Sequence, residues 1–433
     1  MPDKIFINTL KFLLYLIPIG LITGPFIPDF SLTLMALIFI FLSIKNNLWK
    51  YYYGNKFVKF FLFFNLYLII SSLISDDILF SLKSSFAYFR FLIFSISVWY
   101  LLDNSKNLFK KSYSIYLFIL FLILSLDAVY QFKFNNNIVG FEMVQLDRVS
   151  GFFNDKMVLG SFFIRMCPLA ILLFFIFSEV KYKALLSIIL YIATIIVILI
   201  SGERTALGLF FIFTFLILII NREKKSFLIL IVLPLLITVS LSSFNKKIQY
   251  RLFFEPLQQS NLISDAFIGK YFPEEKKSYV HLSKYPVIFS REHTQHYKTA
   301  FKMFLDKPFM GVGPKMYRKK CGDDKYNSGA ESCSTHPHNF LLQILSETGI
   351  IGFTFYLVAL CFIISKLARK SNDFKNNKKI NYIETICLIT FFINLFPFIP
   401  TGNIFNNWLS VIFYFPVGFY LHQTTLKIGI NRG

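Results

Sequence analysis

The sequence predicts an all-α polytopic integral membrane protein with about twelve transmembrane helices and one large outer loop. Three observations support this fold class. The chain is 55% hydrophobic and 19% aromatic. Only 16% of its 433 residues are charged, whereas soluble domains carry about 25%. The apolar residues fall in long runs separated by short basic clusters. A soluble protein would expose much of this apolar surface to water, so a membrane is the expected solvent.

Most candidate spans hold about 17–20 apolar residues, which matches a hydrocarbon core of about 30 Å crossed at 1.5 Å per residue. Their approximate limits are 8–26, 30–44, 57–75, 84–102, 113–131, 157–178, 183–201, 204–220, 226–243, 339–365, 380–399 and 404–422. No cleavable signal-peptide pattern is visible, because the first apolar run leads directly into the next.

The distribution of charge predicts the orientation. The net charge of +21 comes from 45 Lys and Arg against 24 Asp and Glu. Basic clusters recur in every second connector, at 45–59, 106–111, 181–183, 222–225 and 366–379. Because cytoplasmic loops retain Lys and Arg, both termini are predicted to be cytoplasmic. The charge therefore indicates topology and not nucleic-acid binding, which would gather the basic residues on one wet face.

Two outer connectors are long, at about 132–156 and 244–337. We divide the chain into a first transmembrane domain (1–243, about nine helices), a large outer loop (244–338) and a second transmembrane domain (339–433, about three helices). Within the loop, residues 291–305 carry apolar side chains at helical spacing, which predicts an amphipathic helix. This helix either packs on the membrane domain or lines a site.

The placement of cysteines fits an oxidising outer face. Cys321 and Cys333 lie in the outer loop with eleven residues between them. A disulfide closing so short a loop would contribute roughly 2–3 kcal/mol. The alternatives to this disulfide are two free thiols or metal ligands, although no CxxC motif accompanies them.

Histidines gather at the end of the outer loop. Five of the six lie in the loop or at its end, and His336 and His338 immediately precede the next span. Asn339, Gln343 and Glu347 are four residues apart, so one face of that helix is polar. A carboxylate within the bilayer should face a cavity or a partner. A His at the water boundary suits a general base; the alternative is a His pair that only caps the helix.

Three arginines stand at predicted outer positions, namely Arg148, Arg204 and Arg291. Guanidinium groups bind phosphate oxygens in pairs and keep their charge at a membrane interface. A cluster of them at the outer leaflet therefore suits a lipid-linked pyrophosphate. The alternatives are snorkelling to lipid headgroups or pairing with Glu203 or Glu292.

Several motifs are absent from the sequence. It contains no P-loop, no Rossmann glycine fingerprint and no HExxH motif. The first outer connector lacks an Asp-x-Asp pair to hold a divalent metal on a sugar diphosphate. Charges deep within the spans are few, which argues against an ion-coupled transporter. We therefore predict neither a cofactor nor a metal.

Two stretches carry a resemblance to a known family. Residues 306–313 read D-K-P-F-M-G-V-G, and residues 336–352 read H-P-H-N-F-L-L-Q-I-L-S-E-T-G-I-I-G. In this order they resemble the signature region of the O-antigen ligase/polymerase superfamily of bacterial membrane glycosyltransferases. Residues 201–206 (S-G-E-R-T-A) and 148–154 (R-V-S-G-F-F-N) are similar to two further segments of that family.

The resemblance implies a metal-independent, GT-C-like glycosyltransferase in the bacterial inner membrane, with its site at the periplasmic face. The implied donor is a glycan linked to undecaprenyl pyrophosphate. The implied acceptor is lipid A–core for an O-antigen ligase of lipopolysaccharide biosynthesis, or another lipid-linked glycan for a polymerase. A flippase or transporter of lipid-linked sugars, or a non-catalytic scaffold, is the alternative from another class.

The resemblance also implies roles for individual residues. His338 would deprotonate the acceptor hydroxyl, which attacks the anomeric carbon with inversion. Arg204, Arg148 and Arg291 would hold the pyrophosphate and stabilise it as the leaving group. His336 would make a secondary polar contact.

Asn339 would orient the reacting groups. Gln343 and Glu347 continue the polar face behind it, and we count them as candidate substrate-binding residues together with His336.

Overall fold

The computed structural model describes residues 2–143, 148–220, 227–275, 288–376 and 378–430. Within these ranges the chain is helical, and its β pairing is one isolated bridge between Asn136 and Glu142. Each predicted span coincides with a helix. These helices are α1 (Pro2–Thr23), α2 (Phe26–Lys45), α4 (Lys56–Leu73), α5 (Ile78–Asp103), α6 (Asn107–Phe134), α7 (Leu159–Phe177), α8 (Lys183–Ser201), α9 (Arg204–Ile220), α11 (Leu233–Phe244), α17 (Phe340–Lys375), α18 (Tyr382–Asn394) and α19 (Asn407–Ile430).

Eight of the described helices are long and apolar enough to cross a membrane. A ninth span is present if the bent pair Leu228–Phe244 and Lys246–Gln259, which meet at 116°, is counted as one. Helices α9 and α18 are apolar but shorter. The fold is thus a polytopic helical membrane protein, and these lengths do not decide the predicted number of twelve spans.

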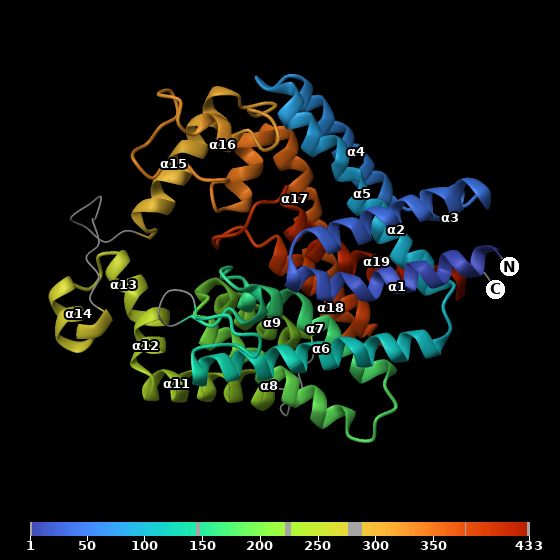
Figure 1. The fold of residues 1–433 in the computed structure, drawn as a ribbon. Helices are drawn as coiled ribbons and strands as arrows, with labels where there is room; N and C mark the ends of the chain where they lie inside the picture. Colours follow the sequence, from blue (N-terminus) through green and yellow to red (C-terminus); the bar gives the residue numbers. More distant parts are fainter. Residues whose placement is uncertain (1, 144–147, 221–226, 276–287, 377, 431–433) are drawn as a thin grey trace.

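The arrangement of the helices agrees with the predicted alternation of sides. Both termini lie on the same side of the molecule as α3 (Trp49–Tyr52), and α13 (Glu255–Gln259) and α15 (Arg291–Asp306) lie toward the opposite side (Figure 1). This placement is what an even number of crossings would produce. Which side faces the cytoplasm stays a prediction from the charge pattern.

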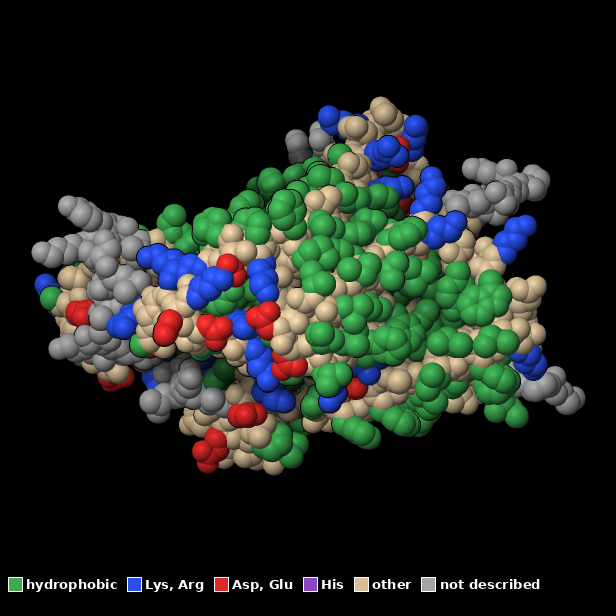
Figure 2. Space-filling view, turned by 90° about the horizontal axis from the view of Figure 1, so that it is seen from above, with side chains coloured by type: hydrophobic (Ala, Val, Ile, Leu, Met, Phe, Trp, Pro, Cys, Tyr) green, Lys and Arg blue, Asp and Glu red, His purple; other side chains and the backbone are tan. Residues whose placement is uncertain are grey.

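The main core is built around α5, which packs against α2, α4 and α19. Gly418 on α19 permits the close approach to α5, because a Cβ atom there would lie 2.5 Å from the Cβ of Val98. Other spans present apolar side chains outward, such as Phe63 and Leu66 on α4. Figure 2 shows a broad field of such side chains, with charged residues at its margins. That surface is suited to lipid contact.

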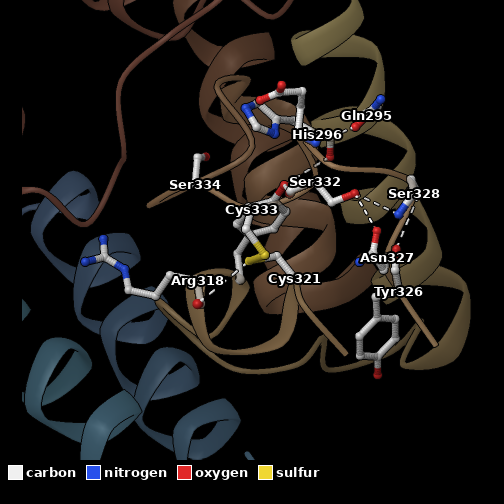
Figure 3. Close-up of a disulfide and its surroundings, with 12 residues drawn as sticks. Gln295, His296, Arg318, Cys321, Tyr326, Asn327, Ser328, Ser332, Cys333 and Ser334 are labelled. Carbon is white, nitrogen blue, oxygen red and sulfur yellow. Dashed lines mark hydrogen bonds between the residues drawn. A yellow bond between two sulfur atoms is a disulfide. The ribbon is translucent and has the colours of Figure 1, made fainter. Parts of the chain in front are cut away.

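The described part of the outer loop contains the predicted amphipathic helix. It is α15, whose N-cap is Ser290 and which ends at Asp306 as expected. Helix α15 packs with α16 (Tyr317–Lys320) around a small separate core that includes Ala300, Met303 and Tyr317. Cys321 and Cys333 form a disulfide in this unit, as the sequence predicted (Figure 3).

The predicted uninterrupted span that begins at residue 339 needs a correction. Gly349 has φ 61° and ψ −166°, so α17 consists of two helical pieces separated by a sharp break. Phe340 in the first piece touches Tyr356 in the second, with ring centroids 6.0 Å apart. The first piece therefore folds back beside the second. Hydrophobicity alone cannot detect this break, because both pieces are apolar.

Helix α18 is also shorter than predicted, since it ends at Asn394 and not at residue 399. Pro397 and Pro400 follow closely, and proline disfavours helical backbone before it. The connector that follows turns back into the protein, where the backbone N–H of Thr401 donates to the carbonyl of His338 at 2.9 Å. This connector thus holds the histidine segment in place.

Candidate active site

Four histidines form one cluster on the outer side. The ring centroid of His338 lies 4.2 Å from that of His336, 5.2 Å from that of His296 and 5.9 Å from that of His293. The first two come from the segment before α17, and the last two come from successive turns of α15. The amphipathic helix therefore lines this site as well as packing on its own core. His281, another loop histidine, lies outside the described residues.

The ring of His338 lies against the other three histidine rings, and it differs from that of His336 in its hydrogen bonding. His338 has φ 54°, a left-handed conformation that is uncommon for a residue other than glycine. Among the described residues, its ring nitrogens have no hydrogen-bond partner. By contrast, His336 uses Nε2 on the carbonyl of Thr401 (3.0 Å) and Nδ1 on the hydroxyl of Thr335 (2.9 Å). This difference supports His338, and not His336, as the reacting group.

Burial keeps these imidazoles neutral. It lowers the pKa of His338 to about 3, with further contributions from His336, His296 and His293. The pKa values of His336 and His293 are both lowered to about 4, again mainly by burial. A neutral imidazole can accept a proton, but one with so low a pKa is a weak base. A bound anion beside the cluster would raise these pKa values, because it stabilises the protonated form.

A second cluster, the arginine cluster, consists of Arg148, Arg204 and Arg251. The pKa of Arg148 is lowered to about 10, mainly by burial and also by the charges of Arg251 and Arg204. Arg148 donates through Nε to the carbonyl of Ser201 at 3.0 Å. Arg204 donates to Oε1 of Gln259 at 3.2 Å. The three cations repel one another, and the carboxylates of Glu203 and Glu255 offset part of this repulsion, since Glu255 pairs with Arg251 and both act on Arg148.

The arginine cluster lies next to the histidine cluster. The charge of Arg204 contributes to the lowered pKa of His293, so it acts on both groups. Its position is set by the turn before α9, where Gly202 has φ 64° and lies against Arg148 and Arg251. A group that binds between the clusters would meet guanidinium groups on one side and neutral imidazoles on the other.

Glu203 fixes this turn to the start of α7. Its carboxylate accepts hydrogen bonds from the backbone N–H groups of Gly160 (2.7 Å) and Ser161 (3.0 Å). Negative charge at a helix N-terminus is favourable. Glu203 is buried, and burial raises its pKa while the nearby Arg148 lowers it. Glu203 was considered in the sequence only as a partner of Arg204, and the structure gives it this positioning role.

Arg291 is placed differently from the expected cluster of three. It begins α15, two residues before His293, and it is not among the charges that act on Arg148. Arg251, which the sequence reasoning missed, takes that position. The Nε atom of Arg291 is buried and has no hydrogen-bond partner among the described residues. Its predicted contact with pyrophosphate stays a prediction, and an unpaired buried donor is consistent with it.

The polar face of α17 forms a buried hydrogen-bond network. Asn339 caps the helix by accepting from the N–H of Leu342 at 3.0 Å and donates to the carbonyl of Pro397 at 2.9 Å. Gln343 and Glu347 are both fully buried. Gln343 Nε2 donates to Glu347 Oε2 at 2.9 Å. Gln343 also bonds Asn403 and Ile404, at 2.9 and 3.1 Å.

These hydrogen bonds hold the polar face of α17 in place next to the histidine segment. The substrate-binding roles predicted for Asn339, Gln343 and Glu347 stay predictions.

The two signature stretches of the sequence contact each other at the break in α17. The backbone N–H groups of Val312 and Gly313 donate to the carbonyls of Ser346 and Glu347, each at 2.9 Å. On the other side of the break, the N–H of Ile350 donates to the carbonyl of Pro308 at 2.8 Å. The glycine-rich turn thus satisfies backbone groups that a broken helix leaves unpaired.

Sequence reasoning missed three features of the site. Arg251 lay in a loop with sixteen basic residues, so nothing in the sequence distinguished it. His293 and His296 were noted as loop histidines, and their spacing of three along an amphipathic helix was a usable signal. Thr401 offered no signal, because its contact with the histidine segment spans more than sixty residues. Among the described residues, no group of three or more His, Cys, Asp or Glu is arranged to hold a metal ion.

The fold and the site define a polytopic helical membrane protein in which a neutral histidine cluster lies beside an arginine cluster at one face. The sequence model described as O-antigen ligase matches residues 187–357, a range that includes Arg204, Arg251 and all four clustered histidines. A protein of Rickettsia conorii named "Putative polysaccharide ligase" is 29% identical over 216 residues. That match covers 48% of this chain and 50% of the relative, so it spans half the relative's length. Over these residues the chain is similar to proteins of the O-antigen ligase superfamily.

Proposed function

We propose that the protein is an inverting membrane glycosyltransferase that moves a glycan from undecaprenyl pyrophosphate to lipid A–core, as an O-antigen ligase. The observation that carries the proposal is the proximity of the two clusters, because the charge of Arg204 lowers the pKa of both Arg148 and His293. A pyrophosphate would occupy the arginine side, and the acceptor hydroxyl would approach the ring of His338. The family match and the named relative support a ligase chemistry of this kind.

The arginine cluster would stabilise the leaving group. As the bond between the anomeric carbon and the pyrophosphate oxygen breaks, its electron pair passes to that oxygen. Negative charge then grows on a group held by guanidinium donors, which are positioned before the reaction begins. The unpaired Nε atoms of Arg251 and Arg291 offer further donors. This arrangement supplies charge stabilisation from the protein's own side chains.

His338 would act as the general base. The acceptor hydroxyl transfers its proton to a ring nitrogen of His338 while its oxygen bonds to the anomeric carbon from the face opposite the pyrophosphate. Burial lowers the pKa of His338 to about 3. The anionic donor raises this pKa, so donor binding makes His338 a stronger base. Proton removal is thereby coupled to the presence of the donor.

The second candidate is a polymerase, in which the acceptor is another lipid-linked glycan. Its chemistry at the anomeric carbon is the same and would use the same residues. The two candidates differ only in which molecule supplies the hydroxyl. The ligase and the polymerase are therefore distinguished by the acceptor that they use and not by their site residues.

The test supplies purified protein in lipid vesicles with an undecaprenyl-pyrophosphate glycan, either with lipid A–core or with donor alone. We expect transfer to lipid A–core. In His338→Ala and Arg204→Ala, we expect the transfer rate to fall by about 100-fold or more. Lys298→Ala, an exposed position on α15, is the control and should keep full activity.

Chain extension with donor alone would replace the ligase assignment with the polymerase. Full activity of His338→Ala would show that His338 is not the base. An absence of transfer under both conditions, with folded protein confirmed by its melting curve, would overturn the transferase proposal.

A further inference from the structure

The stretch from Lys307 to the disulfide cysteine Cys321 carries five cations. These five cations are not equivalent. Three pair with aspartates at the turn between α4 and α5: Lys307 with Asp76 (2.9 Å), Lys319 with Asp77 (3.4 Å) and Lys320 with Asp76 (2.6 Å). The other two, Lys315 and Arg318, form no ion pair with any described residue. The protein thus neutralises most of this positive surface and leaves two charges free.

Lys315 and Arg318 are held firmly by the residue between them. The backbone N–H of Tyr317 donates to Glu347 Oε1 at 3.0 Å, and its hydroxyl donates to the carbonyl of Ser332 at 2.7 Å. The disulfide joins the end of α16 to the segment that leads to His336. Figure 3 shows the Arg318 side chain extended away from this disulfide. Two unpaired cations therefore sit on a fixed backbone.

The backbone at Lys315 is itself unusual. Its φ of 62° lies in the left-handed region, which is unfavourable for a side chain of this kind. Hydrogen bonds of the two residues before it hold it there, since Pro314 accepts from the hydroxyl of Ser81 (2.9 Å) and Gly313 donates to Glu347. Strain of this kind persists where the surroundings fix it, and it is found at ligand-binding positions.

The acidic groups near Lys315 and Arg318 are engaged with other partners, so this pair can bind an anion. Burial lowers the pKa of Lys315, and the nearby charge of Arg318 lowers it further. The acidic groups that face Lys315 are Glu347 and Asp29. Both are already engaged: Glu347 accepts from Tyr317, and Asp29 pairs with Arg90 at 2.6 Å. Lys315 is half-buried and Arg318 is exposed, so both charges are accessible to an anion from outside the protein.

Lys315 and Arg318 are separate from the arginine cluster, but both groups lie close to the proposed base, His338. Arg318 acts on the pKa of His336, whereas Arg204 acts on His293. His338 touches both histidine rings, at 4.2 and 5.9 Å. The base is thus flanked by two cationic groups, as a reaction between two anionic lipids would require.

We propose that Lys315 and Arg318 form a second anion site that binds a phosphate group on the acceptor glycolipid and places its hydroxyl at His338. The inference rests on the proposed transferase function and assigns the acceptor side of that site. The same phosphate chemistry is present in ordinary phospholipid headgroups, so the experiment separates the two sources.

The experiment compares wild type, the double variant Lys315→Gln/Arg318→Gln and the control Lys319→Gln, each in phosphatidylcholine vesicles. The acceptor is lipid A–core, either intact or with its phosphates removed enzymatically. We expect the double variant to raise the KM for the intact acceptor by about tenfold or more, as loss of charge-assisted hydrogen bonds does. The KM for the donor should stay within about twofold, since the arginine cluster is intact.

With the dephosphorylated acceptor, wild type and double variant should have the same KM. Equal losses on both acceptors, a raised donor KM, or the same effect in Lys319→Gln would overturn the proposal. A loss seen only after phosphatidylglycerol is added to the vesicles would also overturn it, because the site would then bind bulk lipid headgroups.

A binding measurement separates this inference from the proposed function. In a His338→Ala background, labelled intact acceptor should bind about tenfold more weakly when Lys315→Gln/Arg318→Gln is added. This loss would support the anion site even if transfer were never observed. Unchanged binding would overturn the site even if transfer activity were confirmed.

Discussion

The backbone N–H of Tyr317 donates a hydrogen bond of 3.0 Å to Oε1 of Glu347, thirty residues further along the chain. This bond joins the loop after the glycine-rich turn to the buried face of α17. On the same helix, Gln343 donates to the other carboxylate oxygen. One carboxylate thus holds the segment after the first signature stretch against the second stretch, in which His336 and His338 lie.

We expect Glu347→Ala to destabilise the protein. The change leaves the N–H of Tyr317 without its acceptor in a fully buried position and removes one acceptor of Gln343. Each buried donor left unpaired costs about 1–3 kcal/mol. The midpoint of thermal unfolding in detergent should fall, and Glu347→Gln, which keeps one oxygen, should fall less. Glu331→Ala, at an exposed position, is the control. An unchanged midpoint in Glu347→Ala would contradict the structural role.

We expect Gly349→Ala to destabilise the protein more than the addition of one methyl group usually does. A Cβ atom at this residue would lie 2.3 Å from the carbonyl oxygen of Phe309, and the backbone has φ 61° and ψ −166°. The combined clash and strain should cost more than about 3 kcal/mol. Gly208→Ala is the matched control, because no atom lies within 4 Å of a Cβ there. Similar yields and melting points for the two variants would show that the break in α17 does not require glycine.

The disulfide should stabilise the unit that carries the site. We expect Cys321→Ser/Cys333→Ser to lower the free energy of unfolding by roughly 2–3 kcal/mol. Transfer activity should fall with it, because the disulfide joins α16 to the segment before His336. A reducing agent should reproduce the loss in wild type and have no effect on the variant. Cys361→Ser, at an exposed free cysteine, is the control. Full activity of reduced wild type would refute this role.

Stability should fall as the pH is lowered below about 6.5. The folded-state pKa values of His338, His336 and His293 are lowered to about 3, 4 and 4, whereas a histidine in the unfolded chain has a pKa of about 6.5. Between about pH 4 and 6.5 the unfolded chain therefore binds protons that the folded protein does not, and unfolding is favoured. Above this window the histidines are neutral in both states, and their effect vanishes.

The measurement is the melting midpoint of wild type and His293→Gln at pH 7.5, 6 and 5. Since the variant lacks one of these titrations, it should lose less stability than wild type as the pH falls. Each histidine contributes up to about 1.4 kcal/mol per pH unit in this window. A difference between the two proteins that stays constant with pH would rule out the neutral, buried state of His293.

The positions of the helices were predictable from the sequence because burial in a membrane requires long apolar runs. All twelve predicted spans coincide with helices, and the amphipathic helix of the outer loop ends at Asp306 as expected. The break at Gly349 was not predictable from hydrophobicity. It depends on hydrogen bonds to the turn at 308–313, which lies about forty residues earlier in the chain.

Local sequence thus determined the helical membrane fold and indicated the candidate site residues, because hydrophobicity, charge and residue type are properties of short segments. The tertiary structure alone decided which of these residues meet. It placed Arg251 beside Arg148. It also engaged the ring of His336, whereas the ring of His338 has no hydrogen-bond partner among the described residues. These positions depend on contacts between segments that are far apart in the sequence, and a local sequence pattern cannot predict such contacts.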